Sequence, residues 1–214
     1  MAFRGWPVEA LEFYEGLEVD NSKSYWQANK DTYDRLVRAP MDALLAELEP
    51  EFGATRVFRP YRDIRFSRDR SPYKTAIGAM VGSGYVQLSA VGLAAGCGMW
   101  EMAPDQLERF RAAVGEDATG EELAALVAAA REAGLTVMAR EELKTAPRGY
   151  PKDHPRIELL RHKGLITWKH WPAGAWLGTA KAKGRVVEFF RASASLVAWL
   201  RERVGPSALP ERRR

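Results

Sequence analysis

A change in hydrophobic period constrains the fold more than any other feature of this 214-residue sequence. Between residues 55 and 100 apolar side chains alternate with polar or small ones, and short connections such as Gly82-Ser83-Gly84 interrupt the alternation. Period-two patterns predict half-buried strands, and tight turns join such strands in antiparallel pairs. We therefore expect a meander of strands over 55–58, 63–67, 75–81, 85–91 and 93–100.

Helical periods precede this sheet region. Apolar residues three and four positions apart predict a first helix over residues 7–17. Asp20-Asn21-Ser22 offers N-cap oxygens for a second, longer helical segment. Pro40 lies inside that segment, and we expect a kink or a restart there because proline cannot donate the helical hydrogen bond.

Helices and further strands follow the sheet region. Pro104 suits a first helical position, and Thr119 with Glu122 predicts a capping box for the next helix. Later elements that we expect are strands over 135–138 and 166–171, a short helix from Pro155 and a final helix over 179–204. The fold class is therefore α+β: a mostly antiparallel sheet of about residues 55–100 plus later strands, packed with N-terminal, middle and C-terminal helices.

Composition and length predict one globular domain. A hydrophobic content of 46% and a charged content of 28% are ordinary for such a chain, and no apolar run is long enough to span a membrane. The first residues lack the apolar stretch of a signal peptide, so we expect a cytoplasmic protein that does not enter a membrane. We expect residues 1–204 to form a single domain and residues 205–214 to be a disordered basic tail.

Common catalytic signatures are missing from the sequence. It contains no Walker loop, no H-E-x-x-H, no paired C-x-x-C and no G-x-S-x-G. Cys97 is the single cysteine and lies among apolar and small residues, which favours a buried thiol. His154, His162 and His170 recur every eight residues but fall on a loop, a helix end and a strand. We therefore expect no metal site, and no residue pattern indicates a particular cofactor.

The densest cluster of charge is the segment from Arg62 to Thr75, which contains five cations and two carboxylates. Guanidinium forks bind phosphate and carboxylate well, so the segment predicts an anion site. A salt-bridge lattice that pins a hairpin explains the same residues equally simply. The sequence leaves both interpretations open.

If the segment is a site, its residues fall into two sets. The catalytic candidates, which would act as a base or transfer protons, are Asp63, Asp69, Tyr73 and His154. The ligand-binding candidates are Arg62, Arg65, Ser67, Arg70, Lys74, Arg148, Asn29 and Lys30. Asp63 and Asp69 could instead orient the cations. This hypothesis requires the 62–75 segment, the 148–154 loop and residues 29–30 to share one cleft.

A second functional hypothesis comes from the charge distribution. Residues 54–75 carry seven basic and two acidic side chains, and residues 144–191 carry eleven basic and three acidic ones. A basic surface with exposed aromatics such as Trp168, Trp171 and Trp176 would suit a single-stranded nucleic acid. Core positions for these tryptophans would remove that argument. The partner is therefore an anionic small molecule in the first hypothesis and a nucleic acid in the alternative.

Three motifs resemble those of an uncharacterised bacterial and fungal family, domain of unknown function 2461. The motifs are Arg62-Asp63-x-Arg65-Phe66-Ser67-x-Asp69-x-Ser71-Pro72-Tyr73-Lys74-Thr75, Trp26-x-x-Asn29-Lys30-x-x-Tyr33, and Pro147-Arg148-Gly149-Tyr150 with Asp153-His154-Pro155. Arg70 stands where the family usually has lysine, and Cys97 replaces the middle of a glycine triplet. The resemblance runs from about residue 13 to residue 199. It implies a single α+β domain and brings no activity, cofactor or catalytic residue.

Overall fold

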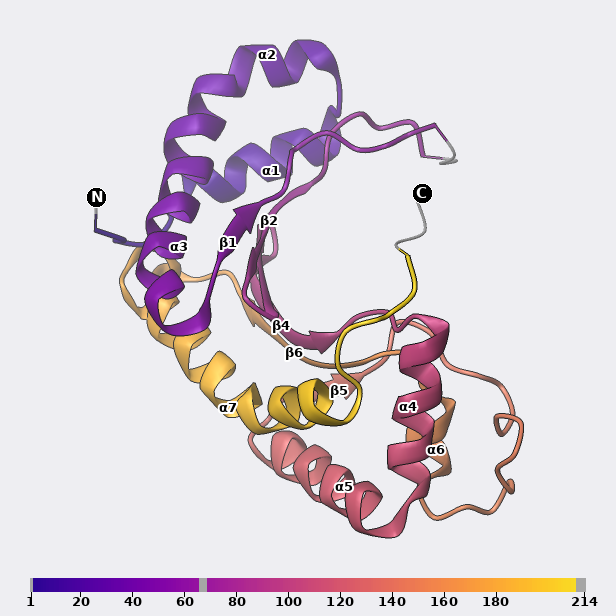
Figure 1. Ribbon diagram of the computed structural model, residues 1–214. Helices are drawn as coiled ribbons and strands as arrows, with labels where there is room; N and C mark the ends of the chain where they lie inside the picture. The colour runs from indigo at the N-terminus through magenta and orange to yellow at the C-terminus, as the bar shows by residue number, and fades with distance from the viewer. Residues whose placement is uncertain (1, 66–68, 211–214) are drawn as a thin grey trace. The chain divides into compact units, whose positions relative to one another are not determined.

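The computed structural model describes residues 2–65 and 69–210. The chain divides into two compact units, Met1–Ala95 with His170–Phe189 and Gly96–Lys169 with Phe190–Arg214. Strands β4 (Gly92–Met99) and β6 (Leu165–Pro172) and helix α7 (Lys181–Arg203) supply residues to both units (Figure 1). The single domain expected for residues 1–204 stays a prediction.

The six strands form one antiparallel sheet with the order β1-β2-β3-β4-β6-β5. Strands β1 (Thr55–Val57), β2 (Ala76–Val81) and β3 (Gly84–Ser89) form the expected meander, with Ile77 opposite Leu88. Strand β5 (Thr136–Met138) pairs with β6. The predicted α+β class, with later strands added to the meander, is confirmed.

The helices of the first unit lie where the sequence predicts them, although the first of them begins and ends two residues later than the expected 7–17. Helix α1 is Glu9–Val19 and α2 is Lys23–Thr32, and the Ser22 side chain accepts a hydrogen bond from the Tyr25 N–H at 3.1 Å. A π-helical stretch, Tyr33–Arg38, then leads into α3 (Ala39–Phe52). Helical backbone continues through Pro40, which lies in the first turn of α3 directly after the π-helical stretch, so the expected kink or restart takes the form of a change from π-helical to α-helical hydrogen bonding at Ala39.

The first unit buries an aromatic cluster between its helices and the end of the 60–74 segment. Phe13 contacts Trp26 and Tyr33, and Trp26 stacks on Tyr73 with ring centroids 4.4 Å apart. Each of these four side chains is buried. Ring pairs of this kind add to the free energy gained from burying their area, so the cluster fixes the start of β2 against the helices.

The strand predicted over 63–67 is wrong for its described residues. Residues 62–64 have no regular structure and Arg65 lies in a turn, while residues 66–68, including Ser67, lie outside the described residues. Among the described residues of the 60–74 segment, the two arms pair beside Tyr61 and Tyr73. Asp63 and Asp69 accept hydrogen bonds from backbone N–H groups two residues ahead, and such local bonds compete with a strand ladder.

The second unit contains helices α4 (Pro104–Gly115), α5 (Asp117–Glu132) and α6 (Ile157–Arg161). Pro104 begins α4, as expected. The capping box predicted at Thr119 is wrong, because Glu116 is the N-cap and its carboxylate accepts the N–H groups of Ala118 and Thr119 at 3.1 and 2.7 Å. The helix therefore begins one turn before the predicted box.

In the first unit a 3-10 turn, Ala175–Gly178, precedes α7.

The glycine trough of β4 is filled by a side chain of the second unit. A Cβ placed on Gly96 would lie 2.9 Å from the Trp168 ring, so the glycine lets this indole approach the backbone. Cys97 is buried as predicted, and burial raises the pKa of its thiol to about 12. Close packing therefore accounts for this stretch.

Residues after α7 continue into ordered contacts with α4. The Asp105 carboxylate accepts hydrogen bonds from the Ser207 hydroxyl at 2.7 Å and the Ala208 N–H at 2.9 Å. Arg109 donates to the carbonyl of Pro206 at 2.8 Å. Residues 211–214 of the predicted tail lie outside the described residues. Within the described ranges, no helix is long and apolar enough to cross a membrane.

Candidate anion-binding pocket

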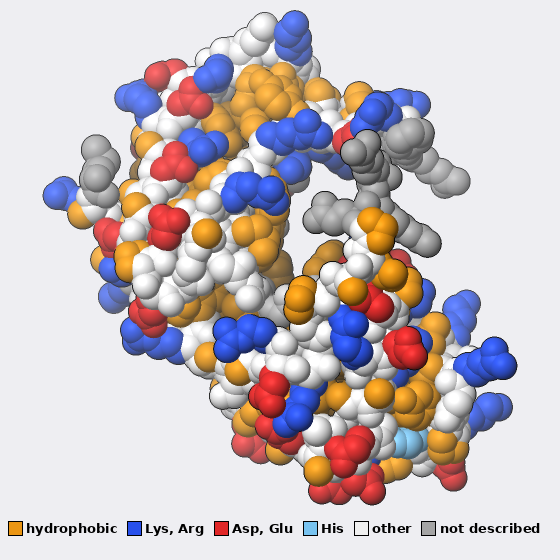
Figure 2. Space-filling model, in the orientation of Figure 1, with side chains coloured by type: hydrophobic (Ala, Val, Ile, Leu, Met, Phe, Trp, Pro, Cys, Tyr) orange, Lys and Arg blue, Asp and Glu red, His pale blue; other side chains and the backbone are white. Residues whose placement is uncertain are grey.

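A pocket of about 370 Å³ opens in the first unit where the 60–74 segment meets β2 and β3. Its lining residues are Phe58, Arg62, Lys74, Thr75, Ala76, Gly78, Tyr85 and Gln87. Two of these are cations, and none of the described lining residues is a carboxylate. Figure 2 shows Lys and Arg side chains distributed over the visible face of the molecule. The pocket is therefore electropositive and lined by hydrogen-bonding side chains.

Strand register builds the back wall of the pocket. Gly78 lies opposite Gln87, and Met80 lies opposite Tyr85. A Cβ on Gly78 would collide with the Tyr85 hydroxyl, so the glycine lets the phenol lie across β2. The Tyr85 hydroxyl donates to Gln87 Oε1 at 2.8 Å. The Tyr85 phenol and the Gln87 amide therefore form this wall and fix each other's position through a hydrogen bond.

Of the two cations that line the pocket, Lys74 is the one that forms no ion pair with a described carboxylate. Its Nζ lies 5.3 Å from the centroid of the Phe58 ring, and its side chain is half-buried. Burial lowers the pKa of Lys74, and the positive charge of Arg59 lowers it further. A cation in such surroundings is stabilised when an anion binds beside it.

Arg62 reaches the pocket from an ion pair. Its Nη1 binds the Asp69 carboxylate, whose other oxygen accepts the Ser71 N–H at 2.9 Å. Hydrogen bonds from Ser71, with a further contribution from Arg62, lower the pKa of Asp69 to about 2. Such a carboxylate is a weak base at neutral pH, so the geometry favours Asp69 as the group that orients Arg62.

Asp63 and Arg65 form a second, exposed pair. Arg65 donates from Nε at 3.0 Å and from Nη2 at 2.7 Å to the two oxygens of Asp63. These bonds lower the pKa of Asp63 to about 2. Arg70 donates to the carbonyl of Ile64 at 3.2 Å. The catalytic role of Asp63 and the ligand-binding roles of Arg65 and Arg70 stay predictions, and none of the three lines the pocket.

Tyr73 has the contacts of a packing residue. Its ring stacks on Trp26, and its backbone N–H and carbonyl both bond to the Asn21 side chain, at 3.0 and 3.1 Å. Burial raises the pKa of its phenol. Proton transfer by Tyr73 stays a prediction, and these contacts give it no support.

Asn29 and Lys30 bond within their own helical segment. The Asn29 amide donates to the Tyr25 carbonyl at 2.9 Å, and Lys30 forms an ion pair with Asp34. Neither residue lines the pocket. Their ligand-binding roles therefore stay predictions.

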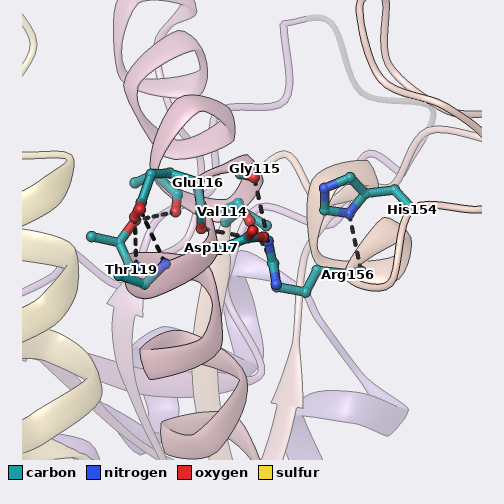
Figure 3. Close-up of polar contacts among 9 residues, drawn as sticks. Val114, Gly115, Glu116, Asp117, Thr119, His154 and Arg156 are labelled. Carbon is teal, nitrogen blue, oxygen red and sulfur yellow. Dashed lines mark hydrogen bonds and ion pairs between the residues drawn. The ribbon is translucent and has the colours of Figure 1, made fainter.

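Arg148 and His154 belong to the second unit, where Arg148 is exposed and His154 is half-buried. His154 Nδ1 accepts the Arg156 N–H at 3.1 Å (Figure 3), and the Tyr150 ring meets the imidazole edge to face with centroids 6.1 Å apart. This contact stabilises the turn before α6, which begins at Ile157. The roles of Arg148 and His154, and the single cleft joining them to the 62–75 segment, stay predictions.

Sequence reasoning missed Arg156, which is buried at the junction of α4 and α5 (Figure 3). Its Nε donates to the Val114 carbonyl at 2.8 Å, and its Nη2 donates to Asp117 Oδ1 at 2.8 Å. A cation here complements the C-terminal end of α4. Gly120, a glycine inside a predicted helix, was the available signal, because a Cβ there would collide with the guanidinium.

Reasoning from motifs also missed Tyr85 and Gln87 as pocket residues, and it left Thr75, the last residue of the predicted anion-site segment, out of the ligand-binding candidates. The available signal was Gly78, a glycine inside a strand pattern, which indicates that another group approaches the backbone. No cluster of potential metal ligands occurs in residues 2–65 or 69–210.

Comparison with known proteins gives one match. A family model described as "Conserved hypothetical protein (DUF2461)" matches residues 9–199. Neither the curated proteins nor the solved structures gave a match.

Proposed function

Since the chain belongs to the DUF2461 family of conserved hypothetical proteins, whose description names no activity, we propose its function from the pocket geometry. The protein is a cytoplasmic enzyme or ligand-binding protein that holds an anionic small molecule, a phosphate or carboxylate, between Arg62 and Lys74. The observation that carries this proposal is Lys74, a half-buried cation that lines a pocket without a described carboxylate partner.

The salt-bridge lattice explains part of the same segment. Arg62 pairs with Asp69, and Arg65 pairs with Asp63, so these residues also serve the architecture of the hairpin. Lys74 takes no part in either pair. A salt-bridge lattice does not require a lysine at position 74, whereas the proposed anion site uses one. Replacing Lys74 therefore distinguishes the two interpretations.

Melting temperatures of paired lysine variants test the proposal. A ligand that binds only the folded protein stabilises it by about 2.7 kcal/mol at a hundredfold excess over its Kd. Inorganic phosphate, or acetate if the site prefers carboxylate, should raise the melting temperature of the wild type and of Lys23→Gln, which removes an exposed lysine. Lys74→Gln should abolish the shift.

Two outcomes would contradict the proposal. An equal shift in Lys74→Gln would place the anion elsewhere, and no shift with either anion in the wild type would leave the lattice as the account of the segment. Arg65→Ala provides the comparison, because it breaks the pair with Asp63 and Arg65 is not a lining residue of the pocket.

The nucleic-acid alternative has less support from these contacts. Arg185 covers the Trp176 ring at 4.0 Å from its centroid, and Trp171 packs edge to face on Phe189. Trp168 packs on Gly96. Their rings are engaged within the protein, whereas stacking on bases requires an accessible ring face.

A further inference from the structure

The positive charge around the pocket exceeds what a single carboxylate of a ligand would neutralise. Arg62 and Lys74 line it, the Arg56 guanidinium lies 5.4 Å from the Phe58 centroid, and Arg59 is close enough to act on Lys74 electrostatically. Among the described residues, Asp69 pairs with Arg62, and Asp63 interacts electrostatically with Arg59, so two carboxylates offset part of these four positive charges. The excess suits a phosphate monoester, which carries a charge of about −1.5 to −2 at neutral pH.

Neutral donors occupy the side of the pocket formed by β2 and β3. Because Gln87 Oε1 accepts the Tyr85 hydroxyl, the Gln87 amide has two N–H donors for a ligand. Thr75 adds a hydroxyl. Such groups bind hydroxyl or carbonyl oxygens, so the ligand carries a polar, uncharged body beside its anionic group.

Size and ring contacts limit that body. The volume of about 370 Å³ lies at the lower end of the range of small-molecule pockets, which favours a small metabolite. The Phe58 ring already contacts Arg56, Lys74 and Tyr85, and these contacts compete with a base that would stack on it.

From these three observations we infer that the ligand is a phosphate monoester with a short hydroxyl-bearing body, in the size range of a triose phosphate to a pentose phosphate. This inference rests on the proposed function. Arg62 and Lys74 bind the phosphate oxygens, and Thr75 and Gln87 bind the body.

Isothermal titration of the wild-type chain with five probes tests the ligand class. The probes are glycerol 3-phosphate, ribose 5-phosphate, inorganic phosphate, glycerate and AMP. Glycerol 3-phosphate and ribose 5-phosphate should bind about tenfold tighter than each of the other three probes, because glycerate lacks the second charge, inorganic phosphate lacks the body that Thr75 and Gln87 bind, and AMP adds a base that this small pocket disfavours. This ranking is measured without a variant, so it does not depend on how a variant folds.

Two variants then assign the contacts. Lys74→Gln should weaken every phosphate probe about tenfold or more, whereas Lys23→Gln should not. Gln87→Leu should weaken ribose 5-phosphate about tenfold more than inorganic phosphate.

Each contrary outcome identifies which proposal fails. Glycerate binding as tightly as glycerol 3-phosphate, with loss in Lys74→Gln, would keep the anion site and overturn the phosphate ester. AMP binding more tightly than ribose 5-phosphate would overturn the size limit. No binding of any probe would overturn both this inference and the proposed function.

Discussion

Replacing Arg156 with methionine should destabilise the second unit strongly. The guanidinium is buried and holds the C-terminal end of α4 through the carbonyls of Val114 and Gly115, at 2.8 and 3.3 Å. Methionine preserves much of the apolar stem, so the variant removes the hydrogen bonds and the charge while keeping the packing. The backbone carbonyls then lose their donor at a position that water reaches poorly.

The contacts set the expected size of the effect. A hydrogen bond from a charged donor contributes about 1.5–3 kcal/mol, and the bond to Val114 is the short, buried one. Asp117 is 89% exposed, so its ion pair with Arg156 is screened and adds less than about 1 kcal/mol. With the longer bond to Gly115, the loss is about 3 kcal/mol, or about 6–12 °C in melting temperature for a chain of this length.

Urea denaturation followed by tryptophan fluorescence measures this loss. Arg148→Met is the matched control, because it removes an exposed arginine from the same loop and should change stability by less than about 0.5 kcal/mol. A loss below about 1 kcal/mol for Arg156→Met, with an unchanged denaturant slope, would refute the view that this arginine secures the junction of α4 and α5.

Three further predictions concern the first unit. Hydrogen bonds hold the pKa of Asp69 at about 2, below its usual value. The stability that the carboxylate contributes is therefore present above about pH 4 and is lost as the pH falls toward 2. Between pH 5 and pH 3, the urea midpoint of Asp69→Asn should fall less than that of the wild type. Gly78→Ala should displace Tyr85, cost about 1–3 kcal/mol by overpacking and weaken ligand binding, and an unchanged urea midpoint would contradict the described wall. Lys74 should react with amine reagents at lower pH than Lys23, and phosphate should protect it; equal labelling by mass spectrometry would contradict both statements.

Much of the fold could be predicted because hydrophobic periods specify it. The meander and the final helix both follow from spacing that burial requires. The strand over 63–67 could not be excluded in this way. Its alternation of polar and apolar residues is real, but Asp63 and Asp69 bond to nearby backbone groups and replace the ladder.

The candidate site was predicted in part for a related reason. Neighbouring residues of an extended chain point to opposite sides, so Tyr73 stacks in the aromatic cluster while Lys74 enters the pocket. A motif that names both residues cannot say which side each one faces. Tyr85 and Gln87 reach the pocket through the register of β2 with β3, which a linear motif does not contain.

A crystal structure of the chain with glycerol 3-phosphate, compared with one of Lys74→Gln under the same conditions, tests the central claim most directly. The account predicts phosphate oxygens within hydrogen-bond distance of Lys74 Nζ and the Arg62 guanidinium in the wild type, and no such density in the variant. Phosphate bound at another surface, or bound equally in both proteins, would contradict it.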